Sequence, residues 1–160
     1  FPSTAPDFAG AIEVDNDGNV NGVDVSMPVM NFSETHYFSP ERVSTDYKKR
    51  IAELTGKINA GSFKGYAAGE VLFLGASVSR RGRYASDLWE ISFKFAVSPN
   101  VSNLKIGTWT VTTKRGWDYL WVRYADDVST DRKALIKKPG AVYVEKVYES
   151  VNFNGLGIGT

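Results

Sequence analysis

Three arginines stand within four positions of the sequence, directly before a stretch of alternating apolar residues: Arg80, Arg81 and Arg83. Guanidinium groups bind phosphates and carboxylates, so this cluster could hold a nucleic acid or the acidic side chains of a protein. A site for single-stranded nucleic acid also needs aromatic side chains among the basic groups, and Tyr84 and Trp89 are close in sequence. Trp89, however, begins the alternating pattern of residues 89–95, which predicts that its ring points into a core.

The charge of the whole chain argues against nucleic acid as a partner. The sequence carries 19 Lys and Arg against 18 Asp and Glu, a formal net charge of +1, so no broad basic field supports the arginines. The preferred interpretation of the arginine-rich stretch is therefore the solvated arm of a hairpin. A contact to the carboxylates of a neighbouring subunit comes second, and a binding site for nucleic acid comes third. No apolar run is long enough to span a membrane, and no membrane partner is expected.

Residue types that perform acid–base or nucleophilic chemistry are sparse. The chain has no cysteine and one histidine, His36, and no serine lies in a G-x-S-x-G turn. His36 falls in a predicted strand, where we expect a structural role beside a carboxylate. Asp126 and Asp127 form a carboxylate pair, but their position between a strand and a polar stretch favours a turn. The sequence therefore predicts a protein that is not an enzyme and has no cofactor.

One stretch resembles a calcium loop. In "DNDGNVNGVD", residues 15–24, oxygen-bearing side chains alternate at Asp15, Asp17 and Asn19. Val20 stands where the EF-hand pattern needs glycine, and no glutamate follows at the twelfth position. A hairpin turn around Asp-Gly is the preferred interpretation, and calcium binding is kept as the weaker one.

The segment "GWDYLWVRY", residues 116–124, is rich in aromatic side chains. A strand here places Trp117, Tyr119 and Trp121 on one face and apolar residues such as Leu120 on the other. Such a strand must be covered on both faces, either by its own domain or by another subunit. The pattern fits a monomer core and a subunit interface equally well.

Hydrophobic periodicity predicts a mainly β, α+β protein. Apolar residues spaced by four, four and three over residues 43–54 predict one amphipathic α-helix, at about 40–55, which begins after Ser39 and ends at Gly56. About seven strands are separated by turn sequences such as "SPNVSN", residues 98–103, and "KKPG", residues 137–140. We expect an antiparallel β-sandwich or a partly open barrel with one packed helix.

The strands are expected to form a single β-rich domain, residues 11–150. Residues 1–10 are rich in Pro, Ser and Gly and are predicted to be a linker-like arm. Because the sequence starts at Phe1, we expect it to be the C-terminal portion of a longer protein. Residues 151–160 are predicted to be a Gly-rich tail that docks on a neighbour through Leu156 and Ile158.

Stretches from end to end of the chain resemble a family of uncharacterised proteins encoded in bacterial phage-like gene clusters. They are "TAPDF" (4–8), "NFSETHY" (31–37), "LTGKIN" (54–59), "GEVLFLGAS" (69–77), "SPNV" (98–101), "GWDYLWVRYAD" (116–126) and "LGIGT" (156–160). The resemblance implies a structural protein of a virion or its tail, made in the bacterial cytoplasm and located in the virion, with a further N-terminal portion. It brings no catalytic residues. The predicted fold is also similar, by analogy alone, to that of phage tail-tube and hub proteins.

The sequence thus predicts a non-enzymatic virion structural protein that assembles with copies of itself and with other virion proteins. The predicted subunit interface comprises the arginine arm, the aromatic strand and the C-terminal tail: Arg80, Arg81, Arg83, Tyr84, Trp117, Tyr119, Trp121, Leu156 and Ile158. The alternative is a module that binds carbohydrate or a cell-surface ligand, because exposed Trp and Tyr rings stack on sugars.

Overall fold

The computed structural model describes residues 17, 29–106, 108–128 and 135–159. The chain divides into two compact units. Unit 1 contains Val101–Lys114 and Asp118–Val147, and unit 2 contains the described residues of Pro28–Asn100, Arg115–Trp117 and Tyr148–Thr160. Each unit is described by itself below.

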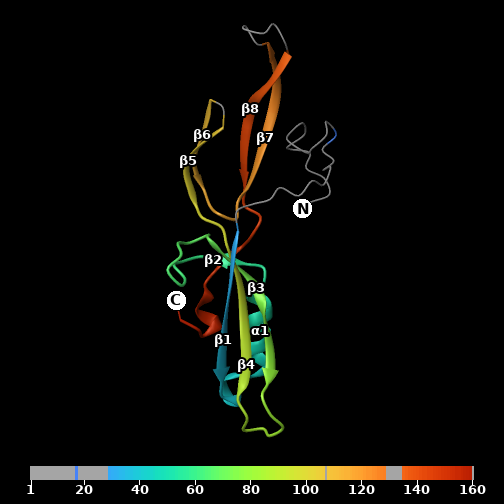
Figure 1. Ribbon diagram of the computed structural model, residues 1–160, viewed down its shortest axis with the longest axis vertical. Coiled ribbons are helices and arrows are strands. Elements are labelled where there is room, and N and C mark those ends of the chain that lie inside the picture. Colours follow the sequence, from blue (N-terminus) through green and yellow to red (C-terminus); the bar gives the residue numbers. More distant parts are fainter. Residues whose placement is uncertain (1–16, 18–28, 107, 129–134, 160) are drawn as a thin grey trace. The chain divides into compact units, whose positions relative to one another are not determined.

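Unit 2 is built on a five-stranded sheet with the strand order β1-β4-β3-β2-β9 (Figure 1). The strands are β1 (Met30–Phe38), β2 (Ile58–Asn59), β3 (Val71–Arg80), β4 (Trp89–Val97) and β9 (Ser150–Val151). The central strand β4 pairs antiparallel with β1 on one side and with β3 on the other. The pairing between β2 and β9 is parallel.

One face of this sheet carries the core, as the alternation in the sequence predicts. Phe32 lies opposite Phe95 across β1 and β4, and Phe73 lies opposite Phe95 across β3 and β4. Ile91 and Phe93 on β4 are fully buried on the same face. The other face is polar over β1 and β4, where the hydroxyls of Thr35 and Ser92 lie 2.9 Å apart. The sheet therefore presents a core face and a solvent face.

Helix α1 (Thr45–Leu54) covers the core face (Figure 1). The predicted helix is confirmed, and Val43, Tyr47 and Ile51 are buried as its spacing requires. A short 3-10 helix, η2 (Pro40–Arg42), precedes α1. The N-cap of α1 is Ser44, whose side chain accepts a hydrogen bond from the Tyr47 N–H at 3.2 Å.

The Gly- and Ala-rich connection between β2 and β3 is ordered by one buried side chain, Asn59. The Asn59 side-chain amide donates to the carbonyls of Gly61 and Ala67, at 2.7 and 2.9 Å. Its oxygen accepts from the N–H groups of Gly69 and Val71, at 3.2 and 2.9 Å. All four hydrogen bonds available to the amide are made, so burial of this polar group is compensated.

The segment Arg115–Trp117 is anchored to unit 2 around Glu70. The Trp117 ring N–H donates to the Glu70 carbonyl at 2.9 Å, and the Gly116 N–H donates to the Asn100 side chain at 2.8 Å. A Cβ on Gly116 would lie 1.6 Å from the Ser98 carbonyl oxygen. Only glycine allows this close approach of two backbones.

Unit 1 contains two antiparallel hairpins among its described residues. They pair β5 (Val101–Ile106) with β6 (Trp109–Lys114), and β7 (Tyr119–Val128) with β8 (Leu135–Glu145). Trp121 and Val122 point to opposite faces of β7 and both are buried, and the Trp121 ring N–H donates to the Glu145 carboxylate at 2.9 Å. Burial lowers the pKa of the Lys114 ammonium, and the Asp118 carboxylate partly opposes this shift.

Three turn predictions fail in unit 1. Asp126 and Asp127, expected in a turn, lie within β7 and pair with Lys137 and Ile136, because the hairpin of β7 and β8 extends beyond them. "KKPG" lies inside β8, and the register shifts opposite it between Arg123 and Tyr124. The prediction is wrong because a proline is tolerated in a two-stranded sheet, where each strand has an open edge, and at a bulge. "SPNVSN" is not all turn either, since β5 begins at Val101.

The fold prediction is confirmed in its coarse form. Within the described ranges the chain is mainly β, with nine strands in three sheets, one short α-helix and no closed barrel. The sequence predicted about seven strands and did not predict β2 and β9, each of which is two residues long. No helix in the described part of the chain is long and apolar enough to cross a membrane.

Candidate assembly surface

The arginine-rich stretch forms an ordered loop between β3 and β4, which we call the tip (residues 79–88). The Arg81 N–H donates to the Leu88 carbonyl at 2.9 Å, so the hairpin ladder continues past the two strands. Asp87 closes the loop, because its carboxylate accepts from the Tyr84 N–H at 2.8 Å. A Cβ on Gly82 would lie 2.0 Å from that carboxylate oxygen. The backbone of the tip is therefore held in one conformation by its own hydrogen bonds.

The tip presents its cations to solvent. Arg80, Arg81 and Arg83 are all exposed. Within the residues that the structure describes, no carboxylate lies at ion-pair distance from any of the three guanidinium groups. Toward other described residues, their one hydrogen bond is that of the Arg80 Nε to the Gly82 carbonyl at 3.1 Å.

Large apolar and aromatic side chains gather beside these cations. Tyr84 is 73% exposed, Leu88 is 49% exposed and Tyr37 at the end of β1 is 51% exposed. The Arg81 guanidinium lies 5.2 Å from the centre of the Tyr37 ring. A shallow pocket of about 450 Å³ lies between Tyr37, Arg81, Asp87 and Leu88. Of these three exposed side chains only Tyr84 was predicted from the sequence, because the strand pairing that brings Tyr37 to the tip is not local.

Trp89 does not belong to this exposed group. It is half-buried against the core, and the Lys48 ammonium lies 4.4 Å from the centre of its ring. The expectation that Trp89 points toward the core is confirmed. A stacking platform for nucleic-acid bases would need this ring to be free.

The three predicted aromatic interface residues lie in different places. Trp117 packs edge-on against Tyr148, with ring centres 5.8 Å apart, in unit 2. Trp121 is buried in unit 1, and Tyr119 is half-buried there. Trp117 thus belongs to unit 2, whereas Tyr119 and Trp121 belong to unit 1.

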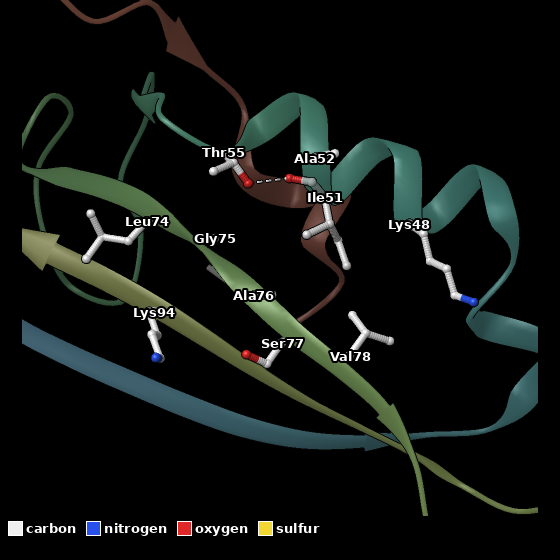
Figure 2. A pocket seen from close by; sticks show the side chains of 10 residues that line it. All are labelled: Lys48, Ile51, Ala52, Thr55, Leu74, Gly75, Ala76, Ser77, Val78 and Lys94. Carbon is white, nitrogen blue, oxygen red and sulfur yellow. Dashed lines mark hydrogen bonds between the residues drawn. The ribbon is translucent and has the colours of Figure 1, made fainter.

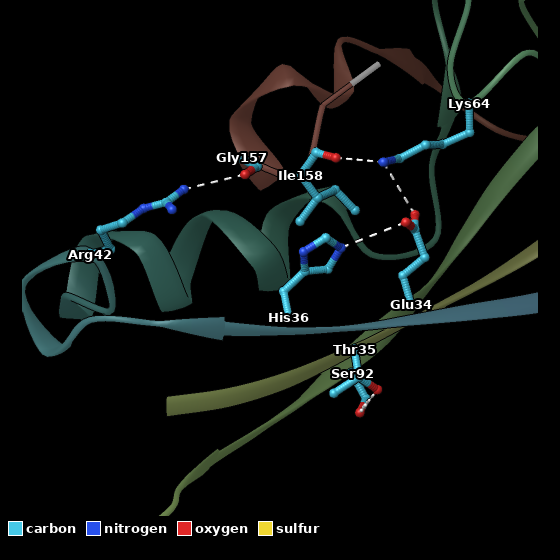
Figure 3. A network of polar contacts seen from close by, with 8 residues as sticks. All are labelled: Glu34, Thr35, His36, Arg42, Lys64, Ser92, Gly157 and Ile158. Carbon is cyan, nitrogen blue, oxygen red and sulfur yellow. Dashed lines mark hydrogen bonds and ion pairs between the residues drawn. The ribbon is translucent and has the colours of Figure 1, made fainter. Parts of the chain in front are cut away.

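The C-terminal segment, residues 153–159, lies against α1 and β1 of its own unit, where Leu156 and Ile158 are buried (Figure 3). Three consecutive backbone carbonyls of this segment each accept a hydrogen bond from a side chain. The donors are Tyr47 to Leu156 at 2.5 Å, Arg42 to Gly157 at 3.2 Å and Lys64 to Ile158 at 2.5 Å. Burial raises the pKa of the Tyr47 hydroxyl, with Arg42 and Arg50 opposing the shift, so the hydroxyl keeps its proton and donates.

His36 lies in the same contact, on the core face of β1 (Figure 3). Its Nε2 is 3.6 Å from one Glu34 carboxylate oxygen, and the Lys64 ammonium is 3.3 Å from the other. A carboxylate therefore lies beside His36 as expected, although among the described residues Nε2 makes no hydrogen bond. The Glu34 and Lys64 side chains join β1 to the connection after β2 and to the C-terminal segment, which is a structural arrangement.

The calcium candidate lies almost entirely outside the described residues. Asp15 and Asn19 are not described, and Asp17 is exposed in a turn. Elsewhere in the described sequence, no three His, Cys, Asp or Glu side chains are grouped as a metal site would require. The side chains of Asp126 and Asp127 are likewise outside the description.

Comparison with known proteins gives no relative for this chain. No protein-family model matches the sequence, and neither a curated protein nor a solved structure matches it.

Proposed function

We propose that this chain is a non-enzymatic structural protein that assembles with copies of itself through the tip. The observation that carries the proposal is the grouping of Arg81, Arg83, Tyr84 and Leu88 on an ordered, exposed loop, with Tyr37 of β1 beside Arg81. Arginine and tyrosine are enriched at the centres of protein interfaces, where burial of their apolar parts and pairing of their polar ends both stabilise the complex.

The order of the loop lowers the entropy cost of forming such a contact. Association costs conformational entropy for each side chain and loop that becomes fixed. The hydrogen bonds of Asp87 to Tyr84 and of Arg81 to Leu88 hold the tip backbone before a partner arrives. A neighbouring subunit that offers carboxylates would then bind without a large further ordering cost.

The finer parts of the proposal rest on resemblance and analogy. They are a place in a bacteriophage virion, with contacts to other virion proteins, and a sandwich or partly open barrel like that of tail-tube and hub proteins. The sequence stretches from "TAPDF" to "LGIGT" support the first part. The mainly β fold with one helix packed on a sheet is compatible with the second.

The pocket at the tip favours one other function, carbohydrate or surface-ligand binding. The Tyr37 ring offers a stacking face, and Asp87 and Arg81 offer an acceptor and donors at the same place. A glycan array probed with the full chain tests this function. A sugar that binds a stable monomer would favour the ligand-binding module over the assembly protein.

The assembly proposal is tested by light scattering on the full chain over a wide concentration range. We expect the mass of the wild type to rise with concentration, and the double variant Arg81→Glu, Arg83→Glu to stay monomeric. The matched control is Lys49→Glu with Lys146→Glu, which makes the same charge change at exposed residues that are not part of the tip. A wild type that is monomeric throughout, or a tip variant that assembles like the control, would contradict the proposal.

A further inference from the structure

A groove of about 540 Å³ runs between α1 and β3 in unit 2 (Figure 2). Ile51 and Ala52 line it from the helix, and Ala76 and Val78 line it from the strand. The site is separate from the pocket at the tip, which has a different set of lining residues. It lies along the part of β3 that, among the strands that the structure describes, has no neighbour on the side away from β4.

The open edge of β3 begins where β2 ends. β2 pairs with β3 only through Ile58 and Leu72. The last bonds on that side join Phe73 to Gly56 and Lys57, at 2.8 and 3.0 Å. From Leu74 to Arg80, β3 pairs with β4 alone among the strands that the structure describes.

The hydrogen-bond pattern identifies which backbone groups face the groove. The Arg81 N–H donates to the Leu88 carbonyl, so these two residues form a bonded pair of the antiparallel ladder. Bonded and non-bonded pairs alternate along such a ladder. The pairs of Arg80 with Trp89, Val78 with Ile91 and Ala76 with Phe93 are therefore non-bonded. The N–H and C=O groups of Ala76, Val78 and Arg80 then point away from β4, toward the open edge.

A bulge shapes the beginning of the edge. The register shifts between Phe73 and Gly75, and Gly75 has φ +118°, a conformation that other residues rarely adopt. A Cβ at Gly75 would lie 3.4 Å from the Thr55 side chain after α1. Leu74 is half-exposed at the same place. The bulge thus keeps the backbone free of side-chain cover and leaves an apolar side chain at the mouth of the groove.

The charged residues that line the groove are both lysines. Lys48 on α1 and Lys94 on β4 line it, and none of the lining residues is acidic (Figure 2). The edge runs on into the exposed Arg80. An occupant of this groove would lie in a positive field, which favours carboxylates.

We propose that β3 receives an extended, acidic segment of a partner protein as an added strand. The backbone of the segment would bond the outward N–H and C=O groups of Ala76 and Val78. Its alternate apolar side chains would contact Ile51 and Ala52 on the helix side. Its carboxylates would point to the opposite face of the sheet, where Lys94 is exposed between the buried Phe93 and Phe95. An edge with small side chains beside an apolar groove is the arrangement that strand addition uses. This inference goes beyond the proposed function and does not depend on self-assembly.

The test uses the full chain and a fluorescent eight-residue peptide that alternates valine with glutamate. Matched probes replace glutamate by lysine, or carry N-methyl groups on alternate backbone amides. We expect saturable binding of the glutamate peptide alone, with amide NMR shifts centred on Ala76 and Val78. Binding of all three peptides alike, or of none, would overturn the proposal.

Two variants then locate the site. Val78→Pro removes an outward N–H without breaking the ladder to β4, and we expect it to weaken binding at least about tenfold. Lys94→Glu should weaken binding about as much, whereas Lys49→Glu, on the same helix as Lys48, should change it less than about twofold. Retention of full affinity in both Val78→Pro and Lys94→Glu would overturn the proposal.

The tip variant Arg81→Glu, Arg83→Glu separates this inference from the assembly proposal, because it should lose self-association and keep peptide binding.

Discussion

The C-terminal segment and the tip were given the same role by the sequence, and the structure places them in opposite environments. Leu156 in the C-terminal segment is fully buried, whereas Tyr84 in the tip is 73% exposed. Three carbonyls of the C-terminal segment accept hydrogen bonds from side chains of its own unit. The tip arginines, by contrast, have no carboxylate at ion-pair distance in the described structure.

The difference separates a surface that is used within the monomer from one that remains available. A partner cannot bind Leu156 without first displacing it from the core, which would cost the free energy of its burial. The tip requires no such displacement. Changes in the C-terminal segment should therefore alter folding, and changes in the tip should alter assembly.

The largest expected effect is that of Leu156→Ala. Removing this fully buried side chain should lower the free energy of unfolding of unit 2 by about 2–5 kcal/mol. The loss comes from the apolar surface that is no longer buried and from the cavity that remains. Urea unfolding, followed by the amide exchange of β4, measures the change. Tyr84→Ala is the control in the tip and should stay within about 0.5 kcal/mol of the wild type. Equal effects of the two variants would remove the distinction between the regions.

Tyr47→Phe should have a smaller effect, about 1 kcal/mol, because it removes one buried hydrogen bond to the Leu156 carbonyl. The pKa of Tyr47 is raised in the folded state above its usual value of 10.0. Stability from this group is therefore complete below pH 10 and is lost as the pH rises from 10 through the folded pKa. Unfolding measured from pH 8 to 12 should show a steeper loss in the wild type than in Tyr47→Phe. Parallel curves would contradict the role of the hydroxyl.

The smallest effect in this series is expected for Lys64→Met. It removes the partner of the Glu34 carboxylate and of the Ile158 carbonyl, but both charged side chains are partly exposed, so the loss should be about 1 kcal/mol or less. Adding Glu34→Gln should restore part of it, because the unpaired carboxylate then disappears. A double-mutant cycle on unfolding free energies tests this coupling. Strict additivity would mean that the pair does not hold the C-terminal segment.

Local patterns in the sequence predicted much of unit 2. The spacing of Val43, Tyr47 and Ile51 predicted the helix, and the alternation over residues 89–95 predicted β4 and its buried face. Both predictions succeeded because each depends on one element with one apolar side. The predicted Arg-rich turn is also present, with Asp87 as its unforeseen organiser.

The remainder depends on contacts between residues far apart in the chain. Asn59 orders its connection through four hydrogen bonds that no periodicity reveals. The C-terminal glycines suggested a tail that docks on a neighbour, although Leu156 and Ile158 fill the core beside α1. The open edge of β3 follows from the brevity of β2, which is two residues long. Such features are set by tertiary pairing and not by local propensity.

Hydrogen exchange of the full chain at low and high protein concentration tests the central comparison most directly. We predict that amides of the tip, residues 79–88, become protected as concentration rises. Amides of the C-terminal segment, residues 153–159, should be protected equally at both concentrations. Assembly without new protection at the tip, or protection of the C-terminal segment that appears only on assembly, would contradict the account.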